Sequence, residues 1–235
     1  MSDPFGTLRL QAAEAPAGPP AWSDIPLNGI LTVAAAVLLF LFLSDIIRLM
    51  PLLLECVTRV RPNLSLEHSL HQARSRNTIA ILALLPFCLM ADRYALYSPQ
   101  FLEAINPGWR APALIGVLVA WLLLRKLVEL LVFAARPPRL DAEERSALHR
   151  NLFNCFVVLV ALQFCSLCIA RFLCSAPDSV IRLILLVETA VMFGVSLGRS
   201  GQILRAKVGG FSTFLYLCAL EWIPAAALVA SAVVL

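Results

Sequence analysis

The sequence predicts an all-α fold, a polytopic membrane helical bundle of about six transmembrane helices with the N-terminus and the C-terminus outside. Three observations predict it. Of the 235 residues, 60% are hydrophobic and 14% are charged, with a mean hydropathy of +0.83, whereas about a quarter of a soluble domain is charged. Six apolar runs reach the length of about 20 residues that a bilayer requires. Basic residues gather in alternate connections between these runs.

The six runs are long enough to cross a hydrocarbon core of about 30 Å, since a helix rises about 1.5 Å per residue. They lie at 28–47, 77–96, 112–133, 152–174, 179–198 and 211–235. No connection between them could hold a soluble domain of about fifty residues or more. The sequence therefore predicts one six-helix transmembrane domain over 28–235. Residues 1–27, rich in Pro and Ala, are expected to form a flexible polar tail.

The basic residues predict the orientation of the bundle. The connections after the first, third and fifth runs hold five, four and three Lys or Arg residues, whereas the tail, the other two connections and the run ends beside them hold five together. Short loops rich in Lys and Arg stay in the cytoplasm, so both termini are expected outside. The longest connection, 48–76, is predicted to be a cytoplasmic segment made of a short interfacial stretch and then a polar helix.

Four ionisable residues lie deep in the runs, where a charged side chain costs about 2.5 to 3.5 kcal/mol on insertion scales. Glu188 and Glu221 are each about 14 to 15 Å from the start of their runs. Arg125 and Glu129 are four residues apart and share one helix face. We expect Arg125 to face Glu188 or Glu221, or both, with Glu129 completing a buried charge network, and none of the four to face lipid.

Two prolines are expected to kink their helices. Pro224 cannot donate to the carbonyl of Leu220, and Pro86 cannot donate to that of Leu82. A freed carbonyl beside Glu221 would suit a cation or proton site of the kind that transporters build at broken helices. The alternative is that both prolines are tolerated kinks that neighbouring helices pack against.

Small residues predict which faces of the last two runs contact protein. Ala225 and Ala232 lie on the same face as Glu221. Ala190, Gly194 and Gly198 form a stripe of small residues on a face turned largely away from Glu188, which predicts that this helix contacts protein on two sides.

The sequence contains no pattern typical of catalysis or metal binding. GxSxG, HExxH, P-loop and dinucleotide fingerprints are absent. Cys165 and Cys168 form a single CxxC without a second pair. His68 and His71 are spaced for one helix face but lack a third ligand, and these histidines and His149 are all expected in cytoplasmic loops. We therefore expect no enzyme activity, no cofactor and no metal site, and the basic residues need no nucleic acid to explain them.

The last run carries a resemblance to a known family. The stretch "FLYLCALEWIPAAALV" resembles the C-terminal signature of an uncharacterised family of bacterial multi-pass inner-membrane proteins, a domain of unknown function. The residues that carry it are Leu217, Cys218, Leu220, Glu221 and Pro224. The likeness extends more weakly over the six runs, including "SRNTIAILALLPF", and Trp222 departs from the aliphatic residue of the family. The resemblance implies the bacterial cytoplasmic (inner) membrane and the topology, but no activity or cofactor.

Two functions fit these observations. The first is an accessory or scaffold component of a membrane assembly, in which buried charges determine helix packing. The second is a proton- or ion-coupled small-molecule transporter that uses the deep carboxylates. The expected partners are the lipid bilayer and other membrane proteins or a second copy of the chain.

Overall fold

The computed structural model describes residues 22–58, 70–135, 142–205 and 209–234. Every regular element in these ranges is a helix, which confirms the all-α prediction. Four segments are long and apolar enough to cross a membrane, namely Arg74–Arg93, Ser146–Leu173, Asp178–Arg205 and Gly210–Ser231. A bent pair of helices near the N-terminus raises the number to five if it counts as one span.

The expected six spans are therefore found only in part. The third expected span, 112–133, is one continuous helix, α6 (Arg110–Ala135), but it is not among the four segments. Its second half carries Arg125, Lys126 and Glu129. The second span belongs to α4 (Leu70–Arg93), which runs through the buried Pro86 as one helix.

The first expected span differs from the structure. Helix α1 (Pro26–Leu41) begins with a proline at its first position, where the missing N–H costs nothing. After Phe42 the chain turns by 71° into α2 (Leu43–Thr58). Helix α2 extends beyond residue 47 because Leu49, Leu53 and Cys56 recur at helical spacing and are buried. Residues 48–58 are thus helix packed on the bundle, and 59–69 lie outside the described residues.

The remaining elements complete the bundle. Three of them are short: η1 (Trp22–Asp24) precedes α1, and α5 (Gln100–Glu103) and η2 (Pro107–Trp109) lie between α4 and α6. Two are long, namely α7 (Ala142–Cys168) and α8 (Asp178–Arg205), which follow α6. A π-helical turn, η3 (Ile169–Leu173), ends the first of them. The last run is divided into α9 (Gly210–Leu217), a π-helical turn η4 (Cys218–Trp222) and α10 (Ile223–Val234). Glu221 therefore lies in a local widening of the helix, three residues before Pro224.

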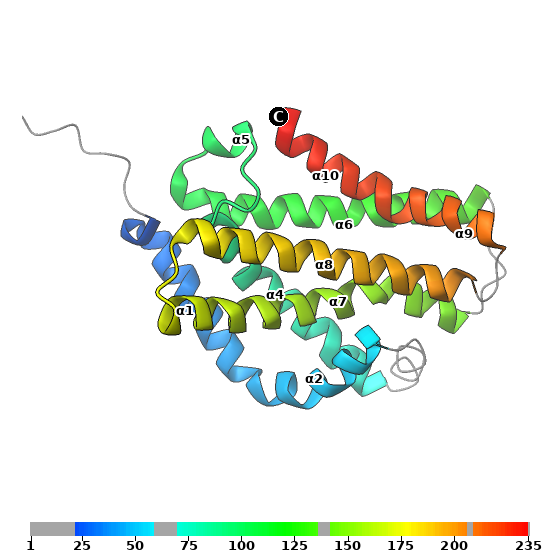
Figure 1. Ribbon diagram of the computed structural model, residues 1–235, viewed down its shortest axis with the longest axis horizontal. Coiled ribbons are helices and arrows are strands. Elements are labelled where there is room, and N and C mark those ends of the chain that lie inside the picture. The colour runs from blue at the N-terminus through cyan, green and yellow to red at the C-terminus, as the bar shows by residue number, and fades with distance from the viewer. Residues whose placement is uncertain (1–21, 59–69, 136–141, 206–208, 235) are drawn as a thin grey trace, which may run out of the picture.

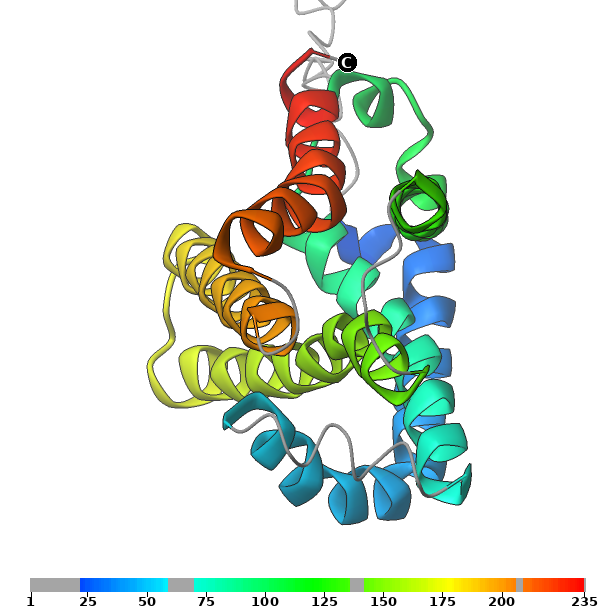
Figure 2. The ribbon, with the colours of Figure 1, turned by 90° about the vertical axis from the view of Figure 1, so that its right-hand side faces the viewer.

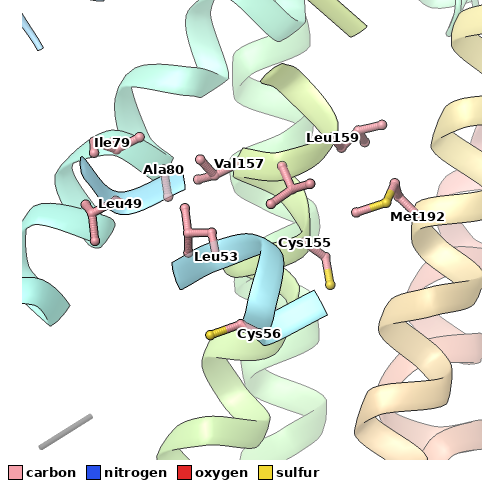
Figure 3. Packing of buried hydrophobic residues seen from close by; sticks show 10 residues of the cluster. Leu49, Leu53, Cys56, Ile79, Ala80, Cys155, Val157, Leu159 and Met192 are labelled. Atoms are coloured by element: carbon pink, nitrogen blue, oxygen red, sulfur yellow. The ribbon is translucent and has the colours of Figure 1, made fainter. Parts of the chain in front are cut away.

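Helices α6, α7 and α8 run along the long axis of the molecule, and the last run crosses over α6 (Figure 1). Helix α4 contacts both α6 and α7. Seen along the bundle, α2 and α10 lie at opposite sides (Figure 2). The largest buried cluster joins Leu53 of α2 to Ala80 of α4 and Val157 of α7 (Figure 3). This packing holds the bent N-terminal pair against the long helices.

The outward faces of the long helices are strongly apolar. Phe40, Leu123, Val187 and Phe211 are all exposed, as expected for side chains that face lipid. The stripe of Ala190, Gly194 and Gly198 is also exposed, and a Cβ added at either glycine would meet no atom of another helix within 4 Å. The expectation that this face of α8 contacts protein is therefore wrong within the described chain, because α8 buries other faces, which contact α7, α9 and α2.

Candidate buried polar site

The structure brings Arg125 and Glu221 together. The Arg125 Nη2 donates to Glu221 Oε1 at 2.6 Å, and the two side chains are 6% and 2% exposed. The partners come from α6 and from η4, and they are 96 residues apart in the chain. A buried guanidinium keeps its charge, so a carboxylate is the partner that neutralises it. Of the two expected partners of Arg125, the structure selects Glu221.

Two further helices are linked to this ion pair by polar side chains, α8 directly and α7 through α8. The Ser200 hydroxyl of α8 donates to Glu221 Oε1 at 3.5 Å. The Asn151 amide of α7 donates to the Ser196 carbonyl at 3.0 Å and to the Ser200 hydroxyl at 3.2 Å. All three side chains are buried. The sequence analysis missed them, although Ser196 and Ser200 stand four residues apart in an apolar run, which is a detectable signal.

Glu129 lies one turn beyond Arg125 on α6 and contacts a different residue. Its Oε2 is 2.8 Å from Nδ1 of His149, and the two side chains are 16% and 29% exposed. His149 was expected in a cytoplasmic loop. The structure corrects this, because α7 begins at Ala142 and carries His149 two turns into the bundle.

The π-helical turn is anchored next to the ion pair. Trp121, one turn before Arg125 on α6, donates its indole N–H to the Pro224 carbonyl at 2.9 Å. Pro224 is itself buried. This contact and the ion pair hold α6 against the start of α10 and against η4, at two successive turns of α6. Ala225 is half-buried, and the side chain of Ala232 lies outside the described residues.

Two atoms of the ion pair have no partner within the described chain. Arg125 Nε and Glu221 Oε2 are both buried and make no hydrogen bond. Buried polar atoms are nearly always satisfied, and an unsatisfied one costs about 1 to 3 kcal/mol. The carboxylate therefore has a free acceptor position for a proton, and the guanidinium has a free donor.

Glu188 lies apart from this site. It accepts a hydrogen bond from Ser166 of α7 at 3.1 Å and is only half-buried, so the expectation that it avoids lipid is not met within the chain. About 18 Å of helix separates it from Ser200. Nearby, the wholly buried Gln163 donates to Thr189 at 3.0 Å and to the Leu185 carbonyl at 3.3 Å.

The described residues contain no group of three or more His, Cys, Asp or Glu side chains that could hold a metal ion. Cys165 is exposed and Cys168 half-buried, and neither is in a disulfide. His68 and the side chain of His71 lie outside the described residues.

A pocket of about 50 Å³ lies at the other end of the bundle, between α4 and α6 and beside α5. Asp92, Glu103 and Arg110 contribute charged groups to its lining. Asp92 also accepts a hydrogen bond from the Trp22 indole at 2.6 Å. At this end Arg171 pairs with Asp178 at 3.1 Å, and Arg93 lies over the Trp22 ring.

Comparison of the chain with models of known families, with curated proteins and with solved structures gives no match. The resemblance of the C-terminal run to an inner-membrane family therefore stays a prediction.

Proposed function

We propose that the chain is a multi-pass protein of the bacterial cytoplasmic membrane and acts as an accessory or scaffold component of a membrane assembly. The observation that carries this proposal is the closed ion pair of Arg125 and Glu221, linked through Ser200 to α8. Each charge has its counter-charge within the same chain. The pair therefore serves to fix helix positions without any bound molecule.

Physical chemistry supports a structural role for such a pair. Removal of one partner from a buried pair costs about 3 to 5 kcal/mol, because the other charge stays unpaired, whereas replacement of both by apolar side chains is often neutral. The pair determines where the last run lies against α6. The face of α8 that carries Ala190, Gly194 and Gly198 contacts no other described helix. Faces of small residues allow the close approach of a second transmembrane helix.

Replacement of the cation tests this role. We expect Arg125→Ala to lower the amount of membrane-inserted protein and the yield of a co-purified partner. Lys126→Ala is the matched control, since Lys126 is the exposed neighbour of Arg125 on the same helix. The double variant Arg125→Met with Glu221→Leu should restore both quantities, because no unpaired charge is left. Loss of partner capture in this double variant despite normal abundance would contradict the scaffold role.

A second candidate is a proton- or ion-coupled transporter. It is favoured by the free Oε2 of Glu221 in a π-helical turn next to Pro224, since broken helices hold coupling ions in many transporters. Purified protein in liposomes would then use or dissipate an imposed pH gradient. Glu221→Gln or Glu188→Gln should abolish this activity in a folded chain. Inert liposomes together with a stoichiometric partner would exclude the transporter.

A further inference from the structure

The ion pair and the Glu129–His149 contact together form a chain of four ionisable side chains. Glu221 is the buried end, at 2% exposure, and His149 is the open end, at 29%. Arg125 and Glu129, on successive turns of α6, stand between them, and Arg125 interacts electrostatically with Glu129. One guanidinium thus has two carboxylates within reach, one across the bundle and one on its own helix.

We propose that Glu221 is a buried proton-binding site that is loaded from His149, with Arg125 moving from Glu221 to Glu129 when the proton arrives. This inference concerns the proton chemistry of the chain and goes beyond either proposed function.

Charge balance supports two states of equal net charge. In the first, Arg125 pairs with Glu221, and a protonated His149 pairs with Glu129. In the second, the N–H bond at His149 Nδ1 has broken and an O–H bond has formed at Glu221 Oε2, while Arg125 pairs with Glu129. Both states are neutral overall, so neither leaves an unpaired charge at membrane depth, where such a charge is costly.

The unpartnered atoms are those that this exchange uses. Glu221 Oε2 has no donor and is free to take the proton, and Arg125 Nε–H has no acceptor and is free to bond a second carboxylate. Residues four apart on a helix are neighbours, so Glu129 is within reach of a rotated guanidinium. Glu129 is also the carboxylate that contacts Nδ1 of His149 at 2.8 Å, and it lies on the route that the proton takes.

The other ionisable groups around Glu221 do not replace these partners. Among the described side chains, those on the surrounding elements include Lys126 on α6, Arg150 and Cys155 on α7, Arg199 and Arg205 on α8, Tyr216 on α9 and Cys218 on η4. Lys126 is exposed, and Arg199 donates to carbonyls at the end of α2. Arg125 is the cation that contacts Glu221.

A double-variant cycle on the full chain in detergent micelles tests the exchange of partners. Glu221→Gln and Glu129→Gln each leave Arg125 one carboxylate, so each is expected to lower the midpoint of thermal unfolding slightly. The double variant leaves Arg125 no carboxylate, and its unfolding midpoint should fall by more than the sum of the two single decreases. Glu188→Gln combined with Glu221→Gln is the control and should be additive. Additive losses for Glu221 and Glu129, or a Glu221→Gln chain that fails to fold, would contradict the proposal.

Infrared difference spectroscopy between about pH 8 and about pH 5, the range in which His titrates, tests the proton itself. The wild-type chain should gain the carbonyl band of a protonated carboxyl group. Glu221→Gln should lose this band and Glu188→Gln should keep it, while His149→Gln should delay its appearance after a pH jump. A band that survives Glu221→Gln, or an unchanged rate in His149→Gln, would overturn the proposal. Neither measurement depends on partner capture or transport, so its result is independent of whether either proposed function is correct.

Discussion

A single amide can join two helices inside an apolar bundle, as Asn151 does here. Its side chain lies on α7 and donates to a backbone carbonyl and a hydroxyl of α8. Through Ser200 the same side chain reaches the carboxylate of Glu221. In a membrane such bonds link helices that have no hydrophobic reason to prefer each other over lipid.

At the residue scale we therefore expect Asn151→Leu to lower the free energy of unfolding in mixed micelles by about 0.6 kcal/mol, the average measured for interhelical bonds in membranes, and by at most about 1.7 kcal/mol. Thr32→Val is a matched control, because the Thr32 hydroxyl donates only to the Asn28 carbonyl of its own helix and is exposed. An equal loss in both variants would show that Asn151 does not link the helices.

At the element scale, one side chain from α8 binds the C-terminal end of α2. The last carbonyls of a helix have no partner within that helix. Arg199 Nε donates to the Val57 carbonyl at 2.7 Å, and its Nη2 donates to that of Thr58. A cation at this C-terminal end also interacts favourably with the helix dipole. Helix α2 buries Leu53 and Cys56 beneath this contact, so Arg199 controls how firmly the bent N-terminal pair is docked.

Arg199→Gln is expected to speed the labelling of Cys56 by a thiol reagent in a chain whose other cysteines are replaced. Hydrogen bonds from charged groups contribute about 1.5 to 3 kcal/mol, which corresponds to roughly tenfold or more in the population of the undocked helix. Arg205→Gln removes an exposed cation from the same helix and should leave the rate unchanged. Equal labelling rates in wild type and Arg199→Gln would contradict this role.

At the scale of the whole molecule, the long helices run between the two ends of the bundle. The end of α6, the start of α7, the end of α8 and the start of α9 lie at one end of the bundle, and the end of η3 and the start of α8 lie at the opposite end (Figure 1). The orientation with both termini outside rests on the distribution of basic residues alone and stays a prediction.

Labelling from the two sides of the membrane tests this topology. Cys174 is exposed between η3 and α8 and should react with an impermeant thiol reagent from the periplasmic side of intact cells. In a chain without other cysteines, Gly209→Cys should be protected there, since Gly209 precedes α9 at the other end and has open space around it. A reporter fused to either terminus should score as periplasmic. A cytoplasmic signal at the C-terminus would overturn the predicted orientation.

The sequence by itself determined the helical class and most of the helix positions, because composition and run length are local properties that a bilayer constrains strongly. It also identified Arg125, Glu129 and Glu221, since each charge interrupts an apolar run. The sequence did not predict the bend after Leu41, because the apolar pattern continues from α1 into the buried face of α2.

Only the tertiary structure decided the partners. Arg125 had two candidate carboxylates, and the structure brings it to Glu221 and leaves Glu188 with Ser166. It also carries His149 into the bundle beside Glu129 and adds Asn151 and Ser200 to the site. The physical reason is that helical periodicity tells which face of a helix a residue occupies, whereas a contact across the bundle depends on how the helices are shifted and rotated against one another.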